Sequence, residues 1–211
     1  MKKALIIFLL LLSFNKVYAY ENKYFKLDIP EDFKEEEINS NTYKWISTKN
    51  SHEYLIITVS NNSATNKHNV KDYNSNDIKN YEEYMEKEIN NQLKDYNLKV
   101  DVTNVRKEKI NDLDSITYDV FWPTKESILY DTYQKGYSFT TDKYVYVYTF
   151  TSDKQITNEN VNYKKTLDSL ELLDTEIEEK GFLTEKWQQV LLVSVIFGTL
   201  GAIFSLIFRR K

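Results

Sequence analysis

One stretch of the chain reads Tyr144-Val145-Tyr146-Val147-Tyr148-Thr149-Phe150. Aromatic residues alternate with smaller residues at a period of two, which is typical of a β-strand. The aromatic side chains therefore share one face of the strand, and the smaller side chains share the other. The strand is preceded by Thr141-Asp142, a turn that joins it to an earlier run and predicts an antiparallel hairpin.

The tyrosines of this strand allow two interpretations. An exposed ladder of Tyr144, Tyr146 and Tyr148 could bind a glycan or a peptide, because tyrosine offers an apolar ring and a polar tip. Under a packed helix, the same ladder would be core. The core interpretation is favoured, and the ladder is kept as a possible ligand face.

The flanking sequence predicts further strands and two helices. Residues 54–59 are apolar on both faces, which is expected of a central strand. Residues 77–96 carry apolar side chains every three or four positions and predict an amphipathic helix that begins at Asn76 or Asp77. A last helix is expected over residues 158–173. The other predicted strands cover residues 24–30, 43–46, 98–105, 115–122 and 128–139. The fold class is therefore α+β, with a single antiparallel sheet and helices packed on it.

Two sequence features resemble the PsbP-like family of extrinsic and envelope proteins. The first is an opening strand that ends in Ile-Pro and an aromatic, over residues 25–33; the second is the strand at 144–150, which leads to a closing helix at 167–170. The resemblance covers roughly residues 22–173. It implies a domain that assists or docks onto other proteins, and it supplies no catalytic set. A membrane anchor would be a departure from the soluble members.

The N-terminus predicts a cleavable signal peptide over residues 1–19. Lys2 and Lys3 form a positive start, an apolar run follows, and small residues precede position 20. The apolar run is too short to span a bilayer, which takes about 20 residues. We expect the mature chain to begin at Tyr20.

The C-terminus predicts one transmembrane helix. Residues 190–208 carry no charge, and 13 of the 19 are Val, Leu, Ile or Phe. At 0.3 to 0.6 kcal/mol each, these residues favour insertion by about 4 to 8 kcal/mol. Trp187 stands where an interfacial anchor belongs, and the tail carries the cations of the cytoplasmic side, Arg209, Arg210 and Lys211. The protein is thus expected in the cell membrane, single-pass, with its domain outside and its C-terminus in the cytoplasm.

The predicted organisation has five parts. They are a signal peptide (1–19), an extracytoplasmic domain (20–175), a charged linker (176–186), a transmembrane helix (187–208) that contacts the lipid bilayer, and a basic tail (209–211). Small residues form a stripe along one face of the membrane helix, a pattern that allows close helix–helix packing. The residues of this stripe are Ser194, Gly198, Gly201, Ala202 and Ser205.

Charge and composition exclude several function classes. Of the 28 basic residues, three lie in positions 1–19 and three form the tail, so positions 20–208 hold 22 basic and 32 acidic residues, a net charge of −10. Such a domain repels phosphate backbones, and nucleic-acid binding is not expected. The absence of cysteine excludes a disulfide scaffold and thiol chemistry.

No residue pattern specifies a reaction, a metal or a cofactor. His52 and His68 lack a second ligand at metal-binding spacing. Asp72-x-Asn74-x-Asn76 mimics a calcium loop, but a turn followed by a helix cap explains it equally. The acidic run Glu35-Glu36-Glu37 is interpreted as a solvated face. We therefore predict no catalytic or metal-binding residues and no cofactor.

The preferred function is a non-enzymatic, membrane-anchored extracytoplasmic domain that binds or assists another cell-envelope protein. The alternative is a sensor or ligand-binding module for cell-wall glycan or peptide, which requires the tyrosine ladder to be exposed. A third hypothesis is an envelope enzyme whose site is assembled from distant positions and is invisible in the sequence.

Overall fold

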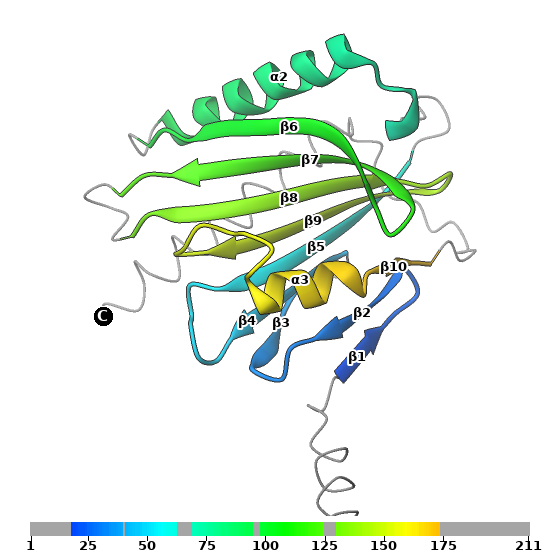
Figure 1. Cartoon of the computed structure of the whole chain (residues 1–211), viewed down its shortest axis with the longest axis vertical. Helices are drawn as coiled ribbons and strands as arrows, with labels where there is room; N and C mark the ends of the chain where they lie inside the picture. Colours follow the sequence, from blue (N-terminus) through cyan, green and yellow to red (C-terminus); the bar gives the residue numbers. More distant parts are fainter. Residues whose placement is uncertain (1–17, 40, 63–68, 95–97, 125–129, 174–211) are drawn as a thin grey trace, which may run out of the picture.

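The computed structural model describes residues 18–39, 41–62, 69–94, 98–124 and 130–173. Within them the chain forms two antiparallel sheets with helices packed on them (Figure 1). In chain order the elements are β1 (Tyr18–Glu21), β2 (Phe25–Ile29), β3 (Phe33–Asn39), β4 (Thr42–Ser47), β5 (Tyr54–Asn61), η1 (Val70–Asp72), α2 (Ser75–Leu93), β6 (Asp101–Ile110), β7 (Leu113–Trp122), β8 (Thr132–Thr140), β9 (Tyr144–Ser152), α3 (Val161–Asp168) and β10 (Glu171–Leu172).

The large sheet has seven strands in the order β3-β4-β5-β9-β8-β7-β6. After β5 the chain passes through η1 and α2 to the far edge, and it returns strand by strand through β6, β7 and β8. β9 then pairs with both β8 and β5, so early and late parts of the chain meet in the middle of the sheet. All nine residues of β9 are buried, as expected of a strand that is covered on both faces.

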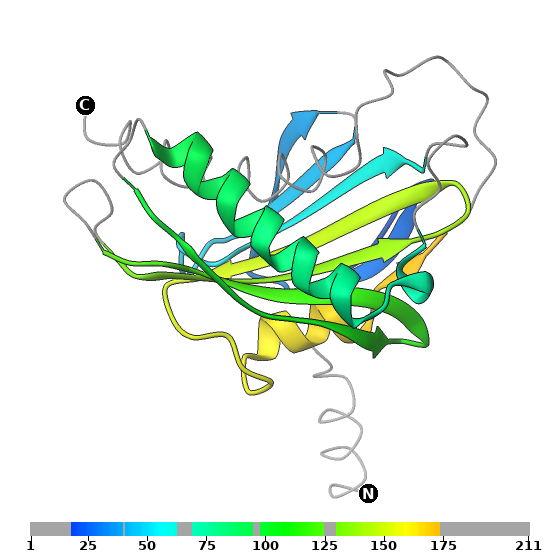
Figure 2. The same cartoon turned by 90° about the horizontal axis from the view of Figure 1, so that it is seen from above.

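One face of the large sheet is covered by α2, which lies along it in Figure 2. The helix buries one side chain per turn, because apolar residues recur every four positions. These residues are Tyr81, Met85, Ile89 and Leu93. They pack against the strands at the β6 side of the sheet, including Val102, Ile116 and Trp122.

The opposite face carries α3 and the small sheet, in which β2 lies between β1 and β10 (Figure 1). Here the aromatic side of β9 packs against apolar residues of β2, β5 and α3 to form the larger core. Phe25, Leu27 and Phe150 are completely buried in it. Burial of such aromatic and aliphatic side chains is the main source of stability in a domain without disulfides.

The structure confirms the α+β class, the antiparallel pairing and the strand nature of the quoted stretch. The predicted hairpin at Thr141-Asp142 joins β8 to β9, with Thr140 paired to Val145. The predicted central strand at 54–59 is β5, which pairs on both sides.

Three expectations about the fold were wrong. There are two sheets rather than one, because β2 pairs with β1 and β10 instead of with the large sheet. The last helix ends at Asp168, where the Ser169 hydroxyl donates to the Lys165 carbonyl at 2.8 Å, and the following residues form β10. α2 begins at Ser75, because the Asn74 side chain accepts hydrogen bonds from the backbone of Asn76 and Asp77 and caps the helix.

The predicted targeting segments lie mostly outside the described residues. Positions 1–17 and 174–211 are not described, and these include the proposed membrane helix, its stripe and its anchors. Tyr18 and Ala19, the last residues of the predicted signal peptide, pair with Ile29 and Asp28 as part of β1. Among the helices that the structure does describe, none combines the length and apolar character needed to cross a membrane.

Candidate protein-binding surface

The tyrosine ladder of β9 lies in the core. Tyr144, Tyr146 and Tyr148 are 5%, 1% and 1% exposed. Tyr148 shares a 2.6 Å hydrogen bond with Thr166 of α3, and the Tyr146 hydroxyl donates to the Leu173 carbonyl at 3.2 Å. The exposed face that the ligand interpretation requires is therefore not formed by these three tyrosines.

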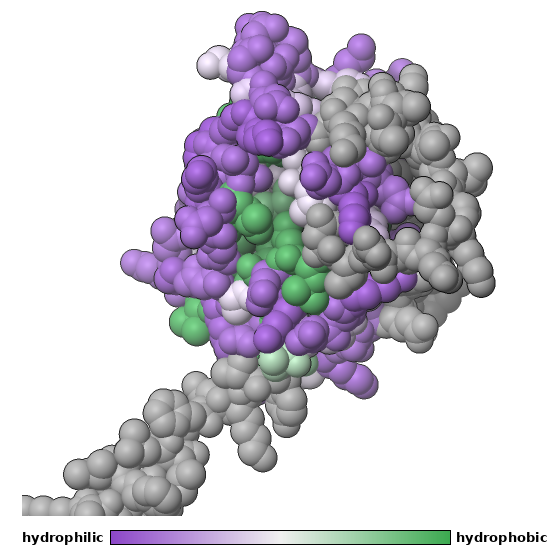
Figure 3. Space-filling view, turned by 90° about the vertical axis from the view of Figure 1, so that its right-hand side faces the viewer, coloured by the Kyte–Doolittle hydropathy of each residue, from purple (hydrophilic) through white to green (hydrophobic). Residues whose placement is uncertain are grey.

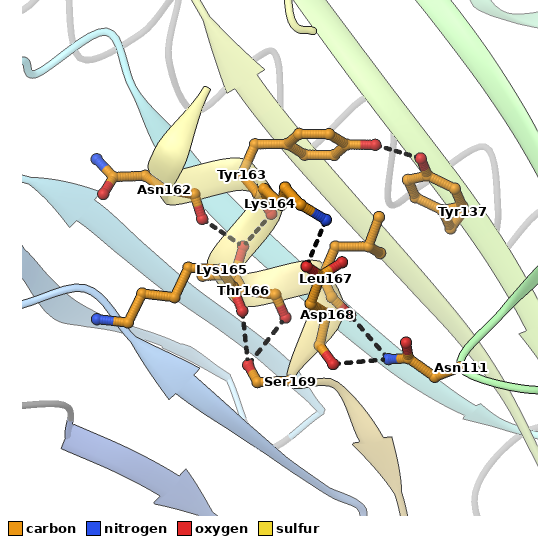
Figure 4. Close-up of polar contacts among 10 residues, drawn as sticks. All are labelled: Asn111, Tyr137, Asn162, Tyr163, Lys164, Lys165, Thr166, Leu167, Asp168 and Ser169. Atoms are coloured by element: carbon orange, nitrogen blue, oxygen red, sulfur yellow. Dashed lines mark hydrogen bonds and ion pairs between the residues drawn. The ribbon is translucent and has the colours of Figure 1, made fainter. Parts of the chain in front are cut away.

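Polar contacts attach α3 to the sheet above this ladder (Figure 4). The Thr166 hydroxyl donates to carbonyls of its own helix at 3.0 Å, so Tyr148 must be the donor in its bond with Thr166. The hydroxyls of Tyr137 and Tyr163 form a second, very short bond. Burial and the neighbouring Tyr137 raise the pKa of Tyr163 far above its usual value. The tyrosines of this network are therefore neutral at physiological pH, and their hydroxyls position α3.

A third attachment comes from the turn between β6 and β7. Asn111 and Asp112 both have positive φ, 49° and 64°, which is the conformation of a two-residue type I′ hairpin turn. From this turn the Asn111 amide donates to the carbonyls of Leu167, Asp168 and Leu170 at 3.0–3.1 Å. Figure 4 shows its contacts with Leu167 and Asp168 at the end of α3. Asn111 thus adds a side-chain donor at the C-terminal end of α3, where the last carbonyls have no N–H partner further along the helix.

Seen from the end that carries the β6–β7 turn, the molecule shows an apolar area ringed by polar side chains (Figure 3). Ile110 and Leu113, which flank the turn, and Leu172 of β10 are partly buried and pack on the larger core. A few partly exposed aliphatic residues are normal for a folded domain, and this area is not the stronger candidate for binding.

The stronger candidate is an aromatic cluster where the small sheet meets β4. Tyr20 of β1 packs on Phe25, Tyr43 and Trp45, with ring centroids 5.9, 6.2 and 4.9 Å away. Tyr43 also packs edge-on against Phe25 at 5.1 Å. Phe25 and Trp45 are buried, whereas Tyr20 and Tyr43 are only partly buried. We call the outer part of this cluster, Tyr20 and Tyr43 with the neighbouring Glu35, the aromatic surface.

Glu35 gives the aromatic surface a negative charge. Glu35 is exposed on β3, directly opposite Trp45 of β4, whose ring contacts Tyr20. Burial, the two neighbouring tyrosines and Glu35 raise the pKa of Tyr43 to about 12. Burial first and Glu35 in addition also raise the pKa of Tyr20. Both hydroxyls are therefore neutral donors at physiological pH.

Tyrosine and tryptophan side chains with buried neighbours are the residue types that dominate protein–protein interfaces. In the aromatic surface the rings are already fixed by their neighbours, so binding would cost little side-chain entropy. The arrangement is suited to recognising a protein partner.

The other candidate metal-binding residues from the sequence either have structural roles or lack a second metal ligand. The calcium-like spacing at 72–76 is a capping box, in which Asp77 accepts from the Asn74 backbone while Asn74 caps the helix. His52 packs on the ring of Tyr130 at 4.5 Å, and His68 is outside the described residues. Of the residues described, no three His, Asp or Glu gather as a metal site would require.

Sequence reasoning did not find the aromatic surface. Tyr20 was assigned only as the first residue after the cleavage point, and Tyr43 only as part of a short strand. Their contact joins strands that are far apart in the chain, and no periodicity reports such a contact.

Comparisons with known proteins give evidence about the fold. No protein-family model matches the chain, and no curated protein matches it. The solution structure of cyanobacterial PsbP (CyanoP) from Synechocystis is similar, with 9% identity and a TM-score of 0.56 over 76% of this chain and 95% of that one. A crystal structure from Bacteroides thetaiotaomicron matches with 13% identity and a TM-score of 0.49, over 74% of this chain; the chain spans about half, 48%, of that protein.

The match to CyanoP shows a PsbP-like fold for the described domain. At 9% identity it carries no site and no activity across to this chain.

Proposed function

We propose that this protein is a membrane-anchored, extracytoplasmic domain that binds or assists another cell-envelope protein and is not an enzyme. The observation that carries the binding part is the aromatic surface, since Tyr20 and Tyr43 reach solvent from a fixed cluster of buried rings. The PsbP-like fold is compatible with this role.

The location is proposed from the sequence. The uncharged residues 190–208, followed by three cations, support a single C-terminal span with the domain outside the membrane. The span would hold the domain close to membrane-bound partners and raise their effective concentration. Its stripe of small residues could pack on a partner's helix.

The test is site-specific photo-crosslinking on intact cells. A photoreactive phenylalanine derivative placed at position 43 should capture a defined envelope protein. The matched control is position 130, where Tyr130 is exposed. Its ring contacts His52 in the turn that follows β4, whereas Tyr43 lies near the start of β4. Capture at both positions, or at neither, would count against a binding role for the aromatic surface.

The location has a separate test. The full chain should sediment with membranes, and a chain that ends before residue 187 should not. Protease added to intact cells should digest the domain. A full chain that stays in the aqueous fraction after lysis would refute the anchor.

A further inference from the structure

The aromatic surface also suggests which chemical group of the partner it binds. Two tyrosine rings and a carboxylate lie together at its rim, namely Tyr20, Tyr43 and Glu35. Aromatic faces attract cations through the ring quadrupole, and a carboxylate attracts them directly. The combination is suited to a positive group that also has an apolar stem.

Three lysines that are next in sequence to aromatic residues of this region have partners of their own. Lys26 pairs with Glu21 at 3.8 Å, and Lys44 pairs with Glu36 at 2.6 Å on the other face of β3 and β4. Lys23 lies over the ring of Tyr24 at 4.7 Å. The Tyr24 ring packs on Tyr43 at 6.4 Å, so a tyrosine next to the aromatic surface already receives an ammonium group. Glu35, opposite Trp45 in the sheet, adds an acidic side chain beside the rings, within a domain whose net charge is −10 between positions 20 and 208.

We propose that the aromatic surface receives a lysine or arginine side chain of the partner protein. The cation would lie between Glu35 and the two tyrosine rings, with its methylene stem against them. The proposal rests on the proposed binding function and adds the chemistry of the partner. An acidic or purely apolar partner segment would gain nothing from Glu35.

The test uses the full chain in maltoside detergent. A fluorescein-labelled peptide with three arginines separated by glycines serves as the probe, and its binding is followed by fluorescence anisotropy at low salt. A peptide with glutamates in place of the arginines serves as the negative probe. We expect the basic peptide to bind and the acidic peptide not to bind.

Variants separate a specific site from general attraction. Glu35→Gln should weaken binding about two- to fivefold, the range expected for one exposed ion pair. Glu83→Gln on α2 removes the same charge far from the surface, where Glu83 pairs with Lys79, and should leave the affinity unchanged. Tyr43→Phe keeps the ring and should bind almost normally, whereas Tyr43→Leu should lose about two- to fivefold. The urea midpoint of each variant checks that it is folded.

Two results would overturn the proposal: no binding of the basic peptide, or equal weakening by Glu35→Gln and Glu83→Gln. The outcome is distinct from that of the crosslinking experiment. If position 43 captures a partner but Glu35→Gln leaves both the capture and the peptide affinity unchanged, the surface binds proteins without recognising a cation.

Discussion

Gly136 offers the sharpest test of how the sheet is packed. It lies on β8 directly opposite Tyr118 of β7, and the Tyr118 ring lies over it. A Cβ added to Gly136 would lie closer than 3.0 Å to two ring carbons and the hydroxyl oxygen of Tyr118, a separation that real Cβ atoms do not show. Tyr118 is completely buried under α2, so its ring has no solvent-filled space into which it could move. Gly136→Ala should therefore destabilise the domain.

The size of the effect follows from two opposing contributions. Overpacking of a full core typically costs about 1–3 kcal/mol. Replacing glycine by alanine returns about 0.4–1 kcal/mol by restricting the unfolded chain. Because two ring carbons and the hydroxyl oxygen of Tyr118 are affected, we expect the upper part of the range to apply and a net loss of about 2 kcal/mol. For a domain of this size that corresponds to a fall in melting temperature of roughly 4–8 °C.

The assay is urea unfolding followed by fluorescence, with a double-mutant cycle. Tyr118→Ala alone should cost about 3–5 kcal/mol through the cavity that it leaves. In that background Gly136→Ala has no ring to meet and keeps only its gain of about 0.4–1 kcal/mol, so the double variant should be about 2–3 kcal/mol more stable than additivity predicts. Ser138→Ala, on the same face of β8, is the control and should change stability little. If Gly136→Ala unfolds at the same urea concentration as the original chain, or if the two substitutions are additive, the packing argument fails.

Three further predictions concern hydroxyls, the turn and pH. The Tyr118 hydroxyl is buried near Thr149 without a hydrogen bond of acceptable geometry, so Tyr118→Phe should be neutral or stabilising. Tyr148→Phe breaks the bond to Thr166 and should lower the free energy of unfolding in urea by about 1 kcal/mol. Equal effects of the two substitutions would contradict this prediction. Asn111→Gly should cost about 1–2 kcal/mol by removing two hydrogen bonds to α3 and one to Leu170 just after it, and Asn111→Ala about 1 kcal/mol more because of the φ of 49° at this position; identical urea midpoints for the two variants would refute the backbone part. Finally, burial raises the pKa of Tyr54, Tyr118 and Tyr148, and that of Tyr43 to about 12, so the folded state keeps protons that the unfolded state loses above about pH 10. The free energy of unfolding should therefore be constant below that pH and fall as the pH rises towards 12. Tyrosinate absorbance that develops well before the protein unfolds would contradict this prediction.

Much of the fold was predictable because the local sequence pattern of its strands and helices agrees with the structure that they adopt. The alternation in β9 and the four-residue spacing in α2 report burial on defined faces, and each was identified with boundaries close to those observed. β3 was missed because its sequence, Phe33-Lys34-Glu35-Glu36-Glu37, is highly charged. It is an edge strand, and charged edges are a common protection against unwanted pairing.

The split into two sheets could not be predicted for a different reason. β2 alternates as expected, but nothing in its five residues says which strand will be its neighbour. Its partners are β1, which overlaps the predicted signal peptide, and β10, which has only two residues. Both pairings depend on the core already being assembled, since β10 follows a helix that packs on β2. The aromatic surface was missed for the same cause, because it exists only where β1 meets β4.

The register of β1 bears on whether the aromatic surface survives processing. The Asn22 N–H donates to the Phe25 carbonyl at 3.0 Å. Hydrogen-bonded pairs in an antiparallel ladder recur every second residue, so Tyr20 with Leu27 is the next such pair and Tyr18 with Ile29 the one after it. Cleavage after Ala19 would remove only the outermost pair and leave the Tyr20 backbone bonded to Leu27. Tyr20 would then be the first residue of the mature chain, and its ring would keep its contacts with Phe25, Tyr43 and Trp45. Cleavage one residue later would remove that ring and open the cluster to water.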